Sequence, residues 1–183
     1  MAKADHNRRP GDPGDPLILA LDCSTRAGSV ALSRGEAPLG EVSFAARPHS
    51  EVLLPAVDFL LKTCGARVQD VDAFAVTRGP GAFTGLRIGI TTAKGLARAG
   101  GKPLLAVSTL EALAFGVSAG DSLVSTTLDA RRGEVWAALW AGGPEGPEIL
   151  EKERGAAPEA WAETAARAAD RPVLFAGDGA ALY

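Results

Sequence analysis

Short apolar runs separated by glycine-containing turns mark the first part of the chain. Residues 17–22, LILALD, form a continuous apolar run, which is typical of a strand buried on both faces. Strand-like runs at 29–33 and 39–44 follow, and the separators carry Gly28 and Gly35. Because connections this short join antiparallel neighbours, the pattern predicts an antiparallel meander.

Helical spacing replaces strand-like spacing at residue 50. Ser50 is predicted as the N-cap of a helix that carries Glu51 in its first turn and ends near Gly65. The apolar residues of this helix occupy two stripes, whereas a helix on a sheet needs only one. The surplus stripe therefore requires a cover, either from another helix of the chain or from a second protein.

A glycine-rich turn opens a second helix, predicted at residues 85–99 between strands at 71–77 and 104–108. Small residues recur every four positions along one side, and basic residues lie on the other. Interior glycines cost roughly 1 kcal/mol each relative to alanine, so they indicate close approach to a neighbour. Packing within the chain explains them, but we favour docking of another subunit. The predicted docking surface consists of Val52, Leu54, Val57, Leu61, Gly85, Gly89, Ala93 and Ala97.

The order of elements partly repeats after residue 109. A helix at 110–117, strands at 122–129 and 134–141, a helix at 158–169 and a strand at 173–176 are predicted. This order predicts an α/β protein with mixed sheets in two related halves, 17–108 and 109–183, the second shorter than the first. Residues 1–16, rich in proline and glycine, are predicted to be a disordered tail.

Several loops at the ends of predicted strands carry residues that suit phosphate binding. Closely spaced glycines at a strand-to-helix turn expose backbone N–H groups to an anion. Neither nucleotide fingerprint is satisfied, because Leu86 and Arg87 follow Gly85 and the glycine spacing is one residue too long for a dinucleotide loop. A tight turn and local capping are the simpler alternatives. The candidate positions are Asp22, Ser24, Thr25, Gly79, Gly81, Thr84, Gly177, Asp178 and Gly179.

Composition narrows the class of protein. The formal net charge of −3 disfavours autonomous binding to nucleic acid. The two cysteines and the absence of a signal-like start predict neither a disulfide framework nor secretion, so a cytoplasmic location is expected. No apolar run approaches the roughly 20 residues that a membrane span needs. We therefore expect no association with a membrane.

Histidine is confined to His6 and His49, so no pair has metal-ligand spacing. No serine lies in a nucleophile elbow either. We therefore assign no catalytic and no metal-binding residue. The turn that contains Arg131 and Arg132 is either a simple hairpin connection or a contact for a partner or for RNA phosphate.

Several segments taken together resemble the TsaB family, also called YeaZ. They are ALDCSTRAGSVAL, HSEVLLP, RGPGAFTGLRIGITTAKGLA, VSTLEALA, DARRGEVWAAL and AGDGA, which together cover essentially residues 17–183. The resemblance implies an actin-like ATPase fold of two ribonuclease-H-like halves. It also implies a role in making threonylcarbamoyladenosine at position 37 of tRNAs that read ANN codons.

The resemblance further implies partners and a division of labour. The related catalytic subunit, TsaD, carries a metal-binding H-x-x-x-H, and the corresponding positions here are Thr109 and Leu113. This chain is therefore expected to be a non-catalytic subunit that docks, through its two N-terminal-half helices, with a TsaD-like subunit or with a second copy of itself. A TsaE-like ATPase would complete the assembly, and tRNA would be reached indirectly.

Expectations about nucleotide and chain length also follow from the resemblance. The chain itself requires no cofactor, while ATP or ADP is expected at the interface of the complex. Cys23 stands where the fold family has glycine near the phosphate, so weak or absent turnover is expected. The family's second half continues beyond AGDGA, so this half is expected to be shortened or truncated. The competing hypothesis is a stand-alone ATPase or phosphotransferase that uses Asp22.

Overall fold

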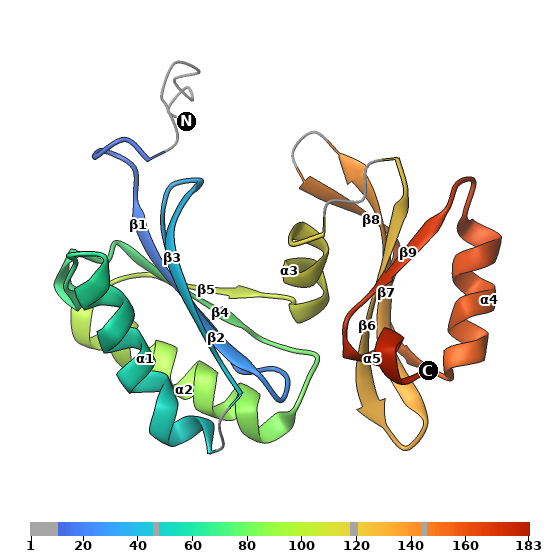
Figure 1. The fold of residues 1–183 in the computed structure, drawn as a ribbon, viewed down its shortest axis with the longest axis horizontal. Helices are drawn as coiled ribbons and strands as arrows, with labels where there is room; N and C mark the ends of the chain where they lie inside the picture. The colour runs from blue at the N-terminus through green and yellow to red at the C-terminus, as the bar shows by residue number, and fades with distance from the viewer. Residues whose placement is uncertain (1–10, 46–47, 118–120, 144–145) are drawn as a thin grey trace. The chain divides into compact units, whose positions relative to one another are not determined.

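The computed structural model describes residues 11–45, 48–117, 121–143 and 146–183 (Figure 1). The chain separates into two compact units. The first takes the described residues up to Thr77 together with Ala82–Ala106, and the second takes Arg78–Gly81 and Val107–Tyr183. The loop after the fourth strand thus belongs to the second unit, although the sequence had placed all of 17–108 in the first half.

The first unit is built on a five-stranded sheet with the order β3-β2-β1-β4-β5. Strand β1 pairs antiparallel with β2, and β2 pairs antiparallel with β3, which confirms the predicted meander. On its other edge β1 pairs parallel with β4. The strands are β1 (Leu17–Asp22), β2 (Gly28–Arg34), β3 (Ala37–Phe44), β4 (Ala73–Thr77) and β5 (Leu104–Val107).

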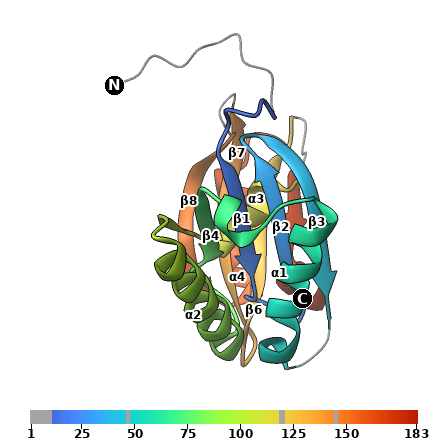
Figure 2. The ribbon, with the colours of Figure 1, turned by 90° about the vertical axis from the view of Figure 1, so that its left-hand side faces the viewer.

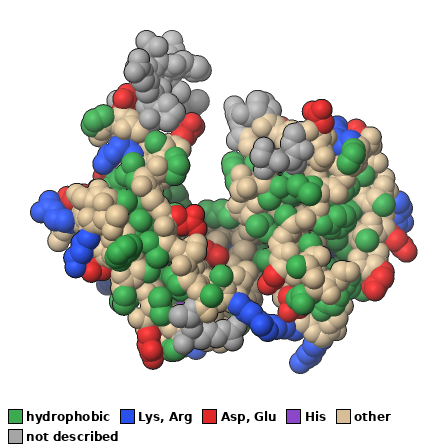
Figure 3. Space-filling view, viewed as in Figure 1, with side chains coloured by type: hydrophobic (Ala, Val, Ile, Leu, Met, Phe, Trp, Pro, Cys, Tyr) green, Lys and Arg blue, Asp and Glu red, His purple; other side chains and the backbone are tan. Residues whose placement is uncertain are grey.

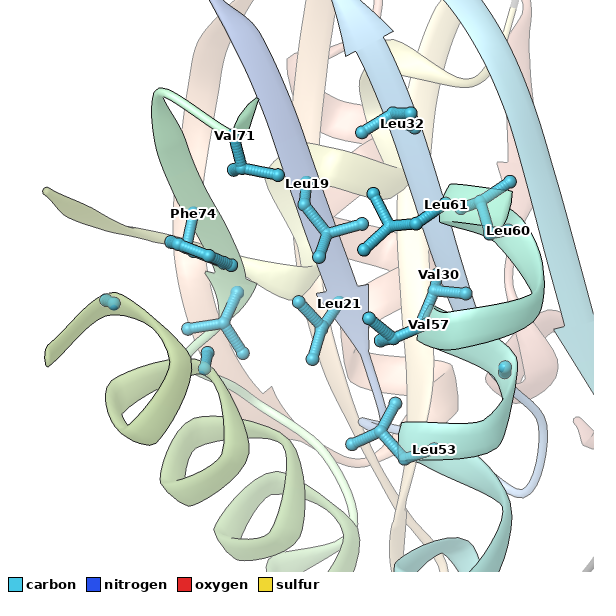
Figure 4. Packing of buried hydrophobic residues seen from close by; sticks show 14 of the residues in the cluster. Leu19, Leu21, Val30, Leu32, Leu53, Val57, Leu60, Leu61, Val71 and Phe74 are labelled. Atoms are coloured by element: carbon cyan, nitrogen blue, oxygen red, sulfur yellow. The ribbon is translucent and has the colours of Figure 1, made fainter. Parts of the chain in front are cut away.

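Two helices cover one face of this sheet, α1 (His49–Thr63) and α2 (Phe83–Gly100), and they lie side by side (Figure 2). Alternate residues of β1 point into the layer between sheet and helices, so Leu19 and Leu21 are buried while Ile18 and Ala20 are half-buried. Leucine and valine side chains of α1 meet them there (Figure 4). A short 3-10 helix, η1 (Val68–Asp70), precedes β4.

The second unit repeats this order of strands in a four-stranded sheet, β8-β7-β6-β9. Strand β6 pairs antiparallel with β7 and parallel with β9, as β1 pairs with β2 and β4. Its elements are α3 (Thr109–Phe115), β6 (Leu123–Arg131), β7 (Glu134–Gly143), β8 (Gly146–Ala156), α4 (Pro158–Ala168), β9 (Val173–Ala176) and α5 (Asp178–Leu182). The prediction of two related α/β units with mixed sheets is confirmed.

Buried hydroxyl groups in β6 accept hydrogen bonds from two tryptophans of the second unit. Three consecutive hydroxyl residues, Ser125, Thr126 and Thr127, are buried. The indole N–H of Trp161 on α4 donates to Ser125 Oγ at 2.8 Å, and that of Trp140 donates to Thr126 Oγ1 at 2.8 Å. Each indole is therefore buried with its donor satisfied.

The sequence pattern predicts neither β8 nor α5. Strand β8 is an edge strand that is half-buried or exposed along its whole length, so its sequence lacks the apolar alternation that identifies strands. The tail prediction is wrong for residues 11–16, because Arg34 donates to the backbone carbonyl of Asp15 and Gly35 N–H donates to that of Pro16. The rest of that prediction, residues 1–10, lies outside the described residues. In the described part of the chain, no helix is both long enough and apolar enough to span a membrane.

Candidate functional site

The carboxylate of Asp22 joins the end of the central strand β1 to the end of its parallel neighbour β4. Its Oδ1 accepts a hydrogen bond from the hydroxyl of Thr77 at 2.5 Å and one from Ser24 N–H at 3.0 Å. The first bond joins β1 to β4, and the second closes the turn after β1. Capping, the simpler alternative, accounts for the bond from Ser24 N–H, whereas the bond from Thr77 joins two strands and is not a local cap. Thr77 is not among the predicted site residues, although a hydroxyl at the end of a neighbouring parallel strand is a signal that could have identified it.

The turn after β1 is closely packed. Ser24 is 1% exposed, and its hydroxyl has no hydrogen-bond partner among the described residues. Thr25 donates to the carbonyl of Ala27 at 3.0 Å, and the ring of His49 lies 3.1 Å from the carbonyl of Arg26. His49 is thus engaged in holding this turn. Thr84, at the start of α2, is exposed.

Cys23 lies inside this turn and has a protected thiol. Burial, and next to it the charge of Asp22, raise the pKa of the Cys23 thiol from 9.0 to about 11. Since only the thiolate reacts with alkylating reagents, we expect Cys64 to label first and Cys23 to label only after unfolding. Mass spectrometry of the iodoacetamide-treated protein, with Cys64→Ser as the control, measures this difference.

The raised pKa also sets a pH dependence. The folded protein favours the neutral thiol, so the contribution of Cys23 to stability is present below about pH 9 and is lost as the pH rises to about 11. Rapid labelling of Cys23 in the folded protein at neutral pH would contradict both expectations.

The other predicted phosphate-loop residues belong to the second unit. Asp178 Oδ1 accepts a hydrogen bond from Asp129 N–H at 3.0 Å, so this carboxylate caps the end of β6. A Cβ on Gly177 would lie 2.1 Å from the carbonyl oxygen of Thr127, and a Cβ on Gly179 would lie 3.0 Å from backbone atoms of Leu128 in β6. These two glycines therefore serve the contact between loop and strand. Gly79 accepts from Thr109 N–H at 2.9 Å, and both Gly79 and Gly81 have positive φ.

Most of the predicted docking surface lies in the core of the first unit. Val57 and Leu61 are 4% and 5% exposed, and Ala93 and Ala97 are 0% and 5% exposed. Gly85 and Gly89 are also buried, against Cys23. The assignment of these residues to an outer surface is wrong. The spacing of residues along a helix shows that they share one side, but not what that side packs against. Here the small residues bring α2 close to Cys23, at the end of β1, rather than to another subunit.

A different set of side chains faces outward from α1 and α2. Leu54 is 52% exposed, Phe59 is 61% exposed and Phe83 is 79% exposed, while Val52 is half-buried. The basic side of α2, including Arg87 and Lys94, is exposed as the sequence had indicated. We call Leu54, Phe59, Phe83, Arg87 and Lys94 the outer helix face. These are the large apolar side chains that α1 and α2 leave exposed, and exposed apolar area on a helix layer is where an interface would form.

Helix α3 carries the positions that were compared with a metal-binding motif. The hydroxyl of Thr109 is buried without a hydrogen-bond partner in the described part of the chain, and Leu113 packs against the core. At the N-cap of this helix, Ser108 donates to Glu153 at 2.6 Å. Across the described ranges, no three His, Cys, Asp or Glu side chains form a group that could hold a metal ion.

Comparison with known proteins gives a consistent set of relatives. The family described as TsaD, tRNA N6-adenosine threonylcarbamoyltransferase, matches residues 43–181. The tRNA threonylcarbamoyladenosine biosynthesis protein TsaB of Bacillus subtilis is 37% identical over 167 residues, which is 91% of this chain and 72% of that protein. TsaB of Escherichia coli is 42% identical over 126 residues, covering 68% of this chain and 53% of its own length.

Among solved structures, YeaZ from Pseudomonas aeruginosa is similar with a TM-score of 0.73 and 39% identity. The match covers 79% of this chain and 68% of that one. The order of strands and helices described above is therefore shared with this relative over most of the chain.

Proposed function

Because the chain belongs to the TsaB family, we propose that it is a non-catalytic subunit of the apparatus that makes threonylcarbamoyladenosine at position 37 of tRNAs reading ANN codons. The fold agrees with this family: two related α/β units of the actin-like type. The curated relatives carry the name of a biosynthesis protein of this modification. The chain spans only about half of the E. coli relative, so the activity of the whole protein is part of the proposal.

One observation carries the non-catalytic role. The transferase family matches the chain over residues 43–181, yet Thr109 and Leu113 stand at the positions that the resemblance aligns with the metal-binding imidazoles. The hydroxyl of Thr109 and the aliphatic side chain of Leu113 cannot take the place of histidine as a metal ligand. The transferase chemistry is therefore assigned to a TsaD-like partner.

The outer helix face is the proposed docking surface for that partner. Leu54, Phe59 and Phe83 supply apolar area, while Arg87 and Lys94 supply positive charge. A partner that fits this surface presents apolar side chains with acidic residues around them. The same surface serves a second copy of the chain when the transferase is absent. A TsaE-like ATPase, and ATP or ADP at the interface of the assembled complex, complete the proposal, which places the protein in the cytoplasm.

The test is a pair of charged substitutions on the proposed surface. Leu54→Glu with Phe59→Glu is expected to weaken binding to the TsaD homologue by roughly 30-fold or more, since the loss of even one buried apolar anchor costs about 2 kcal/mol. Both side chains are exposed, so the folded chain tolerates the change. Calorimetric titration with the purified homologue measures the binding.

A matched control separates docking from general effects of charge. Ala162→Glu lies on the exposed side of α4 in the second unit and adds the same kind of charge. It is expected to bind like the unaltered chain. Wild-type affinity of the Leu54→Glu, Phe59→Glu protein would rule out this surface as the docking site. Threonylcarbamoyl transfer by the chain alone would rule out the non-catalytic role.

A further inference from the structure

The turn between β6 and β7 has an unusual backbone for its residues. Arg131 and Arg132 have φ angles of 70° and 57°, followed by Gly133 at 80°. Two consecutive left-handed residues are typical of tight hairpins, where asparagine and glycine are preferred because side chains with a Cβ are strained there. Two arginines therefore occupy positions whose local conformation selects against them. Such strain is found at functional sites more often than elsewhere.

A single carboxylate holds the first of these arginines in place. Asp129 Oδ1 accepts from Arg131 N–H at 2.8 Å, and Asp129 Oδ2 lies 3.2 Å from a terminal nitrogen of the same guanidinium. Asp129 is itself fixed, because its N–H donates to Asp178 at 3.0 Å. The Arg131 side chain nevertheless remains 60% exposed. Its remaining donors are thus presented in a fixed direction before any ligand binds.

The second arginine is exposed, and it has no ion pair among the described residues. Figure 3 shows Lys and Arg side chains at the lower end of the second unit, where the β6–β7 hairpin lies in Figure 1. The acidic neighbours along the hairpin are Asp129, which binds Arg131, and Glu134, which is the register partner of Arg131. Neither of these carboxylates forms an ion pair with the guanidinium of Arg132 in the described part of the chain.

We propose that this arginine turn, residues 130–133, contacts the phosphodiester backbone of the RNA that the assembled complex modifies. The inference rests on the proposed function, which brings a polyanion to the complex. Guanidinium groups bind phosphate oxygens through paired N–H donors, and a turn that projects from a sheet presents them without other backbone in the way. The net charge of −3 makes the contact an auxiliary one within the complex rather than autonomous binding.

The test replaces both arginines by glycine, which adopts left-handed φ freely and keeps the shape of the turn. We expect Arg131→Gly with Arg132→Gly, assembled with the TsaD homologue, to bind tRNA roughly tenfold more weakly and to reduce the slope of log K against log salt by about 1 to 2, as expected for one or two lost phosphate contacts. Fluorescence anisotropy of labelled tRNA at several salt concentrations measures both. The thermal midpoint of the chain is not expected to fall.

The control is Arg167→Ala with Arg171→Ala, which removes the same charge outside the hairpin. It is expected to keep the salt slope. If the glycine variant keeps wild-type affinity and slope while the wild-type complex modifies tRNA, the arginine turn is not an RNA contact and the proposed function stands. If the glycine variant instead loses the TsaD homologue, the turn binds protein carboxylates and the inference is wrong. Failure of the wild-type chain to assemble at all overturns the proposed function itself.

Discussion

Replacing Gly85 by alanine is expected to destabilise the first unit by about 3 kcal/mol, the upper part of the range for overpacked sites. A Cβ on Gly85 would lie 2.0 Å from the carbonyl oxygen of Cys23, and this neighbour is backbone rather than a flexible side chain. The turn after β1 must therefore move, together with the bonds of Ser24 and Thr77 to Asp22. Urea denaturation followed by circular dichroism measures the loss.

The same helix offers a control with the opposite sign. Gly95 is exposed in α2, and a Cβ there would meet no atom within 4 Å. Gly95→Ala is expected to stabilise the protein by about 1 kcal/mol, the difference in helix propensity between glycine and alanine. Equal effects of the two substitutions would show that propensity, and not the approach to Cys23, explains the glycine at position 85.

Trp161→Ala is expected to destabilise the second unit by about 3 to 5 kcal/mol, as for other large-to-small changes of buried aromatic residues. The side chain is 1% exposed and packs with Leu123, Val135 and Leu139 between α4 and the sheet. The substitution also leaves Ser125 Oγ without its donor inside the sheet. Thermal unfolding followed by calorimetry measures the change in this unit.

Two further variants separate packing from hydrogen bonding at this position. Ser125→Ala keeps the indole but removes its acceptor, and is expected to cost about 1 to 3 kcal/mol. Trp136→Ala, in the same sheet, removes an indole that is 40% exposed and is expected to cost clearly less than Trp161→Ala. If Trp136→Ala destabilised the protein as much as Trp161→Ala, the claim that burial of Trp161 stabilises the core of the second unit would be wrong.

Local patterns predicted the elements wherever one face is buried. The meander of β1, β2 and β3 follows from apolar runs and short glycine turns, and the two helices of the first unit follow from their spacing. Strand β8 lacked any such signal, because the edge of a sheet is held by backbone hydrogen bonds that any sequence can make. Capping was also predicted only in part, since α1 begins at His49 after Pro48 and not at Ser50.

The motifs of the sequence were enough to indicate the family and the two related halves, because these depend on which residues occur and in what order. The motifs could not identify the surface that meets a partner. Periodicity places Leu54 in one stripe with Val57 and Leu61. Only the packed structure shows that Val57 and Leu61 are buried in the core while Leu54 is exposed, as is Phe59 of the other stripe. The small residues of α2 were likewise read correctly as signs of close approach. What they approach is the backbone at Cys23, a contact between segments distant in sequence that tertiary packing alone decides.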